Sequence, residues 1–355
     1  MSEPIGSKQF TYRLLVAIAA IVLAFVVVAF LWHVSQILLI LFAAILVAIF
    51  LDGLTRFGQQ HARMPRWVAL PVALLAVILI LAGFGQAVGA QLLAQIAQLA
   101  DILPRSLEKL RAALMQPPFK PLVAEISFPQ LLPTPGELLD RITGIFSVTL
   151  GILTTPFLIA VLALYLVIDP DLYTNGLVRM LPPDSRPRAR EVLGAVGHAL
   201  RWWLVGRIVS MLVVGALTVI GLVVVGVPAA LALGVIAGAL SFVPYIGPIA
   251  SVVPALLATL PNWPWQAVWV LVVYGGVQVL ESNFITPLVQ ERAVAMPPVV
   301  LLTAQVAFAA LFGLLGVLLA SPLAVVVMVL VQMLYIQDGL GEAIRVLGQQ
   351  RRRNA

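Results

Sequence analysis

The side chains that could carry out chemistry in this sequence are few, and the most prominent of them form one polar cluster late in the chain. The cluster follows a long apolar run and consists of Gln278, Glu281, Ser282 and Asn283. An ionisable side chain at full membrane depth costs roughly 2.5 to 3.5 kcal/mol on insertion scales, so its presence favours a functional role. Glu281 could exchange a proton in a coupled transport step. The alternative is that Glu281 is solvated at the membrane interface or pairs with Arg292.

Two long apolar segments lie on either side of this cluster, and both contain residues that interrupt helices. These residues are Pro244, Gly247 and Pro248 in residues 229–260, and Gly313, Gly316 and Pro322 in residues 298–334. The prolines should expose backbone groups, and the glycines should allow close backbone approach or hinge motion. Paired interruptions of this kind are the best sequence indication of a transporter's binding site. The alternative is that they are kinks that only shape packing, because Gly and Pro are common in membrane helices.

These observations predict a set of substrate-binding or gating residues, in which Glu281 is also the candidate for ion coupling. The set is Pro244, Gly247, Pro248, Gln278, Glu281, Asn283, Pro287, Gly313, Gly316 and Pro322. No catalytic or metal-ligating residue is predicted. Gln305 and Gln332 are expected to form hydrogen bonds between helices. Arg201 and Arg207 are expected to anchor the fifth span at the interface, with recognition of an anionic substrate as the alternative.

The composition places the chain in a lipid bilayer. Hydrophobic residues make up 62% of the 355 residues and charged residues only 10%, whereas a soluble domain has roughly a quarter charged residues. The formal charge of +6 arises from basic residues in short loops and in the tail. Such loops are typical of the cytoplasmic face of membrane proteins, so no nucleic-acid partner is expected. With 0 cysteines and 3 histidines, disulfides and Cys-type zinc sites are excluded, and no cofactor is predicted.

The apolar runs predict an all-α polytopic membrane protein with about eight membrane segments, because backbone polar groups in lipid must be satisfied within the chain. The first two of three helices in residues 1–90 are expected to form a hairpin around Trp32-His33-Val34-Ser35-Gln36. A fourth helix is expected at 142–168, followed by a basic cytoplasmic segment at 169–203. The rest of the chain is expected to form a transport core at 204–337 and a basic cytoplasmic tail at 338–355. The broken segments of the core could be re-entrant. The basic loops predict that both termini are cytoplasmic.

Residues 91–141 read as an extracytoplasmic insert. Leucine and isoleucine recur at helical spacing in its first part, with charged residues between them, which predicts an amphipathic helix. Such a helix is expected to lie on the membrane surface or to pack on a partner chain. The proline-rich residues 117–135 are predicted to lack regular structure.

The C-terminal half also resembles a known family of permeases. The resemblance rests on Gly226-Val227-Pro228, Phe242-Val243-Pro244-Tyr245-Ile246-Gly247-Pro248-Ile249 with Pro254-Ala255, Glu281-Ser282-Asn283-Phe284-Ile285-Thr286-Pro287, and Leu311-Phe312-Gly313 through Gly316 to Ala320-Ser321-Pro322. In order and spacing these motifs are similar to those of the autoinducer-2 exporter family. The N-terminal half agrees only in its hydrophobic layout.

The resemblance implies an all-helical permease of the bacterial inner membrane, similar to proteins that export the furanone-type quorum-sensing signal. It also implies a homo-oligomer, with a pentamer as one candidate. Other family members are described as sodium or lithium/proton antiporters. Where the family often has a polar residue before the proline that opens the last long segment, this chain has Met296-Pro297-Pro298. The resemblance therefore does not fix a ligand contact at that point.

The sequence thus predicts a secondary transporter of a small polar solute of the autoinducer-2 type, rather than an enzyme. No GxxxxGKS or GxxxxGKT loop occurs, so the energy must come from an ion gradient, the membrane potential or the solute's own gradient. One alternative is sodium(lithium)/proton antiport through Glu281. Another is a membrane scaffold that binds partners through Gln91–Leu114. An intramembrane enzyme is not favoured, because the sequence has no HExxH motif.

Overall fold

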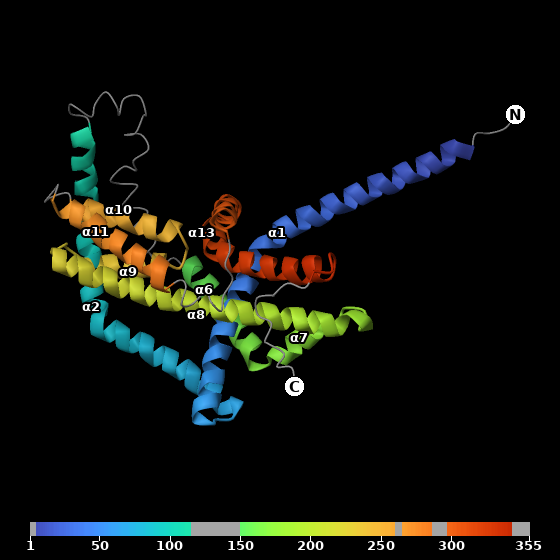
Figure 1. The fold of residues 1–355 in the computed structure, drawn as a ribbon, viewed down its shortest axis with the longest axis horizontal. Helices are drawn as coiled ribbons and strands as arrows, with labels where there is room; N and C mark the ends of the chain where they lie inside the picture. The colour runs from blue at the N-terminus through green and yellow to red at the C-terminus, as the bar shows by residue number, and fades with distance from the viewer. Residues whose placement is uncertain (1–4, 115–149, 260–264, 286–296, 343–355) are drawn as a thin grey trace.

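The structure, a computed structural model, describes residues 5–114, 150–259, 265–285 and 297–342 (Figure 1). Every regular element among these residues is a helix, as the sequence predicts. The helices are α1 (Ile5–Ala62), α2 (Arg66–Leu114), α6 (Leu150–Ile168), α7 (Pro170–Arg179), η1 (Pro183–Ser185), α8 (Arg186–Val225), α9 (Ala230–Leu240), α10 (Ile246–Thr259), α11 (Trp265–Leu280), η3 (Glu281–Ile285), α13 (Pro298–Leu330) and η4 (Val331–Gln337). Of these, η1 is a 3₁₀ turn, whereas η3 and η4 are π-helical turns.

By length and composition, five of the described helices could cross a membrane, or six if α6 and α7 form one bent span. The five lie in α1, α2, α8, α13, and α11 together with η3. The helices α9 and α10 are apolar but shorter. The predicted total of eight membrane segments therefore stays a prediction, while the multi-pass, all-α architecture is confirmed.

The predicted N-terminal hairpin is wrong, because α1 continues as one helix of 58 residues through Trp32–Gln36. This stretch interrupts the apolar run with polar side chains, but it contains neither proline nor glycine, so nothing in it breaks the helical hydrogen bonds. The first half of α1 extends away from the other helices (Figure 1).

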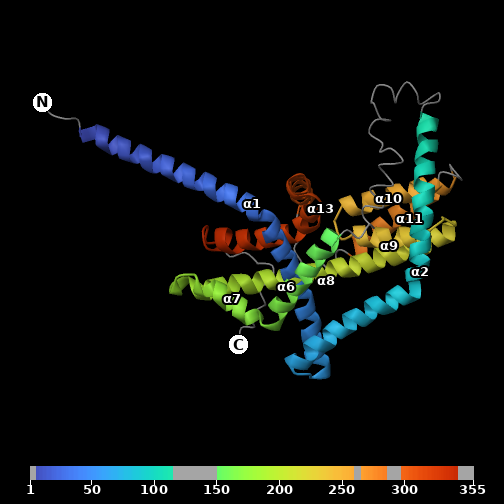
Figure 2. The ribbon, with the colours of Figure 1, turned by 180° about the vertical axis from the view of Figure 1, so that it is seen from behind.

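The helix α2 differs from the prediction in a similar way. It continues through residue 90, where a span was expected to end, and both overall views show it bending between its two halves (Figures 1 and 2). Its predicted apolar face is present, because Leu99, Leu103 and Leu107 are buried. Leu99 and Leu103 pack against α9 and α10 of the same chain. The Gln95 side chain also accepts a hydrogen bond from the backbone N–H of Ala232, 3.0 Å away.

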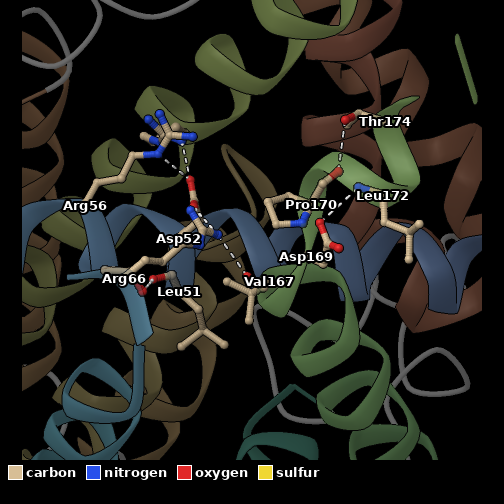
Figure 3. Close-up of polar contacts among 11 residues, drawn as sticks. Leu51, Asp52, Arg56, Arg66, Val167, Asp169, Pro170, Leu172 and Thr174 are labelled. Carbon is tan, nitrogen blue, oxygen red and sulfur yellow. Dashed lines mark hydrogen bonds and ion pairs between the residues drawn. The ribbon is translucent and has the colours of Figure 1, made fainter. Parts of the chain in front are cut away.

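The fourth span ends where the sequence predicts. Helix α6 stops at Ile168, and α7 turns away by 82°. The Asp169 carboxylate accepts a hydrogen bond from the N–H of Leu172 at 3.1 Å and caps α7, and Pro170 occupies the first helical position (Figure 3). Residues 142–149, predicted as the start of this span, and residues 115–141 lie outside the described residues.

The long helix α8 joins two packed groups of helices. Its first half packs with α1 and the second half of α13, through residues such as Leu46, Trp203 and Val329. Its second half packs with α2, α9, α10 and α11, through residues that include Leu222 and Val270. Figures 1 and 2 show α8 running through both groups. The helix therefore contributes to the cores of both groups.

Three glycines bring α8 and α9 into close backbone contact. A Cβ atom built on Gly238 would lie 2.7 Å from the Met211 carbonyl oxygen and 3.0 Å from the Cα of Gly215. One built on Gly234 would lie 2.8 Å from the backbone N of Val219. Small residues four apart are a known way for membrane helices to approach closely. The hairpin formed by α8 and α9 depends on this contact.

We predict that Gly238→Ala destabilises the protein, because its methyl group would collide with backbone atoms of α8. Overpacking of this kind costs about 1 to 3 kcal/mol. Thermal unfolding of the detergent-solubilised protein should show a lower midpoint. Gly276→Ala is the control, because a Cβ atom there has nothing within 4 Å. An unchanged midpoint for Gly238→Ala would contradict the close packing of α8 on α9.

Candidate functional site

The first predicted interruption is a sharp turn between α9 and α10. Tyr245 has a φ of 64°, a conformation that is rare for a bulky residue and is often found at functional sites. A Cβ atom on Gly247 would lie 1.8 Å from the Leu240 carbonyl oxygen, so only glycine fits where the chain folds back. Pro248 lies in the first turn of α10, where proline is tolerated, and does not itself interrupt a helix.

The backbone carbonyl groups at this turn are bound by Arg207 of α8. Its Nε donates a hydrogen bond to the Phe242 carbonyl at 3.3 Å, and one terminal nitrogen donates to the Ser241 carbonyl. The other terminal nitrogen lies 3.9 Å from Oε1 of Glu281, and the exposed fractions of the two side chains are 15% and 6%. Arg207 thus links the turn directly to the predicted ion-coupling carboxylate.

Glu281 is buried inside the helix bundle. The Ser210 hydroxyl donates a hydrogen bond to Oε1, and Nε2 of Gln278 lies 3.4 Å from Oε2. Glu281 also begins the π-helical turn η3, a type of irregularity that is frequent at functional sites. The alternative of a solvated Glu281 is therefore wrong. Arg292, the other suggested partner, lies outside the described residues.

The second interruption lies in α13 at Gly313, whose φ of 62° and ψ of −141° leave the helical region. Gln305 precedes the break and is fully buried. Its Nε2 lies 3.0 Å from the Pro244 carbonyl oxygen and 3.3 Å from the Ser321 hydroxyl oxygen. In a straight helix, Gln305 and Ser321 would lie about 24 Å apart along the axis. The bend at Gly313 therefore brings these two side chains together. Gln305 thus binds the α9–α10 turn and its own helix, rather than a second helix as expected.

The structure brings some of the predicted residues together and leaves others apart. Pro244 and Glu281 lie in one polar network, and Gly316 allows close approach, because a Cβ atom there would lie 2.1 Å from the Phe308 carbonyl. Pro322 is buried beside Ser321. In contrast, Asn283 is exposed and its amide donates to the Val279 carbonyl of its own helix at 2.9 Å. Gln278 is also exposed, although its amide reaches Oε2 of Glu281. Pro287 lies outside the described residues.

Two further buried polar side chains lie on the same pair of helices, Thr218 of α8 and Tyr274 of α11. The Thr218 hydroxyl has no hydrogen-bond partner among the described residues, whereas Ser251 of α10 interacts with the Tyr274 hydroxyl. Thr218 lies about two helical turns from Ser210 along α8, and Tyr274 lies about two helical turns from Glu281 along α11. The two helices are antiparallel here, because Gln266 at the start of α11 donates to the Gly226 carbonyl at the end of α8. Thr218 and Tyr274 therefore lie at a similar depth.

Sequence reasoning missed the roles of Arg207 and Ser210. Arg207 was expected to anchor a helix end, but it binds the turn and Glu281 instead. The sequence feature that could have indicated these roles is the spacing of three residues between Arg207 and Ser210. This spacing places an ionisable and a hydroxyl side chain on one face of an apolar helix. No group of three or more potential metal ligands occurs among the described residues. The site offers hydrogen-bond donors and acceptors and one buried carboxylate.

We predict that Arg207→Gln lowers stability more than the double variant Arg207→Gln/Glu281→Gln. The single variant leaves a buried carboxylate without its cation, which typically costs about 3 to 5 kcal/mol, whereas the double variant removes both charges. Thermal midpoints in detergent measure the difference, with Asn283→Gln as an exposed control. Strictly additive effects of the two substitutions would contradict direct pairing.

Comparison with known proteins agrees with this architecture. Residues 17–336 match the model of the AI-2E family of transporters. YueF of Bacillus subtilis, whose name describes a transport protein, is 26% identical over 340 residues, which cover 90% of each chain. YrrI of the same organism is 31% identical over 177 residues, about half of each chain. The AI-2 transport protein TqsA of Escherichia coli is 22% identical over 328 residues, covering 88% of this chain and 89% of TqsA. The family match spans most of the described helices, and the chain therefore belongs to the AI-2E family of membrane transporters.

Proposed function

We propose that this transporter moves a small polar solute through the helix bundle beside the α9–α10 turn, and that Glu281 couples the movement to protonation. The observation that carries the proposal is the buried pair formed by Arg207 and Glu281. Arg207 also binds the carbonyl groups of the turn. The charge state of one carboxylate thereby affects the position of a broken segment.

The proposed cycle follows from the attraction between these two groups. While Glu281 is ionised, it holds Arg207 beside the turn. Protonation of Glu281 removes the negative charge and weakens that attraction, so Arg207 and the turn can rearrange. A ligand or proton changes a conformational equilibrium only by interacting differently with the two states. The Arg207–Glu281 contact would provide this difference.

The chemistry of the site suits a solute with several hydroxyl or carbonyl groups. The Arg207 guanidinium and the Gln305 amide can donate hydrogen bonds, whereas Glu281 and the buried Oε1 of Gln305 can accept them. The latter atom has no hydrogen-bond partner among the described residues. The hydroxyl groups of Thr218 and Tyr274 would extend the polar route. We propose an autoinducer-2-type signal as the solute, supported by the name of TqsA as an AI-2 transport protein. We propose export as its direction, as the resemblance to the exporter family implies.

Sodium(lithium)/proton antiport remains the second candidate. It is supported by the presence of one buried carboxylate on a membrane helix. However, Arg207 lies beside that carboxylate and would repel a bound cation, so the geometry favours a polar solute. The scaffold alternative loses support, because α9 and α10 already cover Leu99 and Leu103 of the proposed docking helix.

The test is flux into proteoliposomes that contain the wild type, Glu281→Gln or the exposed control Asn283→Gln. We expect pH-dependent flux of labelled autoinducer-2 in the wild type and in the control. Glu281→Gln should remove the pH dependence and lower the flux by about tenfold or more, which corresponds to about 1.4 kcal/mol in the barrier.

Two results would change the proposal. Autoinducer-2 flux that keeps its pH dependence in Glu281→Gln would show that this carboxylate does not couple transport. Sodium-driven proton flux without autoinducer-2 flux, lost in Glu281→Gln, would put the antiporter first.

A further inference from the structure

A second charged cluster lies at the opposite end of α1 from the N-terminus, where three arginines surround one carboxylate. Arg56 Nε lies 2.7 Å from Oδ2 of Asp52, Arg201 lies 2.9 Å from the same oxygen, and Arg66 lies 3.1 Å from Oδ1. Arg66 also donates a hydrogen bond to the Val167 carbonyl at 2.9 Å. Figure 3 shows Arg56 and Arg66 reaching Asp52 from different helices. The cluster thus joins α1, α2, α6 and α8.

The charges in this cluster do not balance. Three guanidinium groups face one carboxylate, and no other ion pair involves these arginines among the described residues. Among the described residues, two positive charges therefore lack a counter-charge. Asp52 is nearly enclosed, with 11% of its side chain exposed, but the arginine side chains keep between 30% and 52% exposed. An anion could reach the guanidinium groups without displacing Asp52.

The unused hydrogen-bond donors favour a phosphate group. Each guanidinium carries five N–H donors in a planar fork that matches a carboxylate or phosphate. Within the described part of the chain, these three arginines form only three hydrogen bonds, two to Asp52 and one to Val167. Paired N–H donors in this geometry bind phosphate oxygens strongly, because both partners are charged.

The surroundings place this cluster at a membrane interface. Trp67 follows Arg66 directly and has 79% of its surface exposed, and Phe57 follows Arg56 with 62% exposed. Large aromatic side chains next to basic residues are typical of the headgroup region. The positive-inside rule assigns these basic residues to the cytoplasmic face, whose leaflet contains anionic lipids. Basic pockets between helices on that side bind phosphate-bearing headgroups.

We propose that Arg56, Arg66 and Arg201 form a binding site for a phosphate group, supplied either by an anionic lipid headgroup or by a free phosphate. The bound anion neutralises the excess positive charge and connects the four helices that meet at Asp52. The site is separate from the Arg207–Glu281 pair and does not depend on the proposed transport cycle.

The test measures thermal unfolding of the full-length protein in detergent. Micelles receive phosphatidylglycerol or zwitterionic phosphatidylcholine, and separate samples receive inorganic phosphate or chloride at equal ionic strength. We expect the midpoint to rise by several degrees with phosphatidylglycerol relative to phosphatidylcholine. A comparable rise with inorganic phosphate alone would identify a free phosphate as a sufficient ligand, whereas a rise confined to the lipid would identify the headgroup.

Two variants test the location. Arg56→Gln/Arg66→Gln leaves Asp52 paired with Arg201, so the cluster becomes neutral and the anion-dependent rise should disappear. Arg56→Gln alone should reduce the rise while keeping two arginines on Asp52. The control Arg179→Gln/Arg190→Gln removes two exposed arginines outside the cluster and should retain the full rise. The proposal is overturned if neither anion raises the wild-type midpoint, or if the cluster and control double variants keep the same rise.

Discussion

The feature on which the transport half of this protein depends is the need to satisfy backbone carbonyl groups inside the membrane. Helices α9 and α10 are interrupted at residues 241–245, so carbonyl groups there lose their helical partners. Lipid offers no hydrogen bonds in return. Arg207 and Gln305 bind these carbonyls from α8 and α13. Once Arg207 is placed there, its buried charge requires Glu281 nearby. The unpaired backbone carbonyls, the buried charges and the packing of the helices therefore depend on one another.

The same requirement explains why α8 is so long and so closely packed. Its second half must place Arg207 and Ser210 beside Glu281, while glycine contacts hold α9 against it. Its first half contributes Arg201 to the cluster at Asp52 and Trp203 to the core with α1 and α13. A single rigid helix thus fixes the relative positions of two charged centres. Loops between shorter helices would not hold them as firmly.

The sequence predicted the local features well, because proline, glycine and buried acids act through their own chemistry. Both interruptions, the end of α6 at Asp169-Pro170 and the polar cluster that contains the buried Glu281 could be inferred from residue type. The turn at Trp32–Gln36 was inferred from polarity alone, and polarity does not end a helix. The partner of Glu281 lies far away in sequence, so no local pattern indicated Arg207. Asn283 is close to Glu281 in sequence, but successive helical residues point in different directions, which explains its exposure.

The bend at Gly313 also relates the length of α13 to the bilayer. The helix has 33 residues, so it would measure about 50 Å if straight, whereas the hydrocarbon core is about 30 Å thick. A straight α13 would therefore push apolar side chains into water on at least one side. Folding at Gly313 shortens the span and keeps these side chains out of water. Hydrophobic matching to lipid thickness thus favours the same bent conformation that Gln305 stabilises, and a thicker bilayer would oppose it.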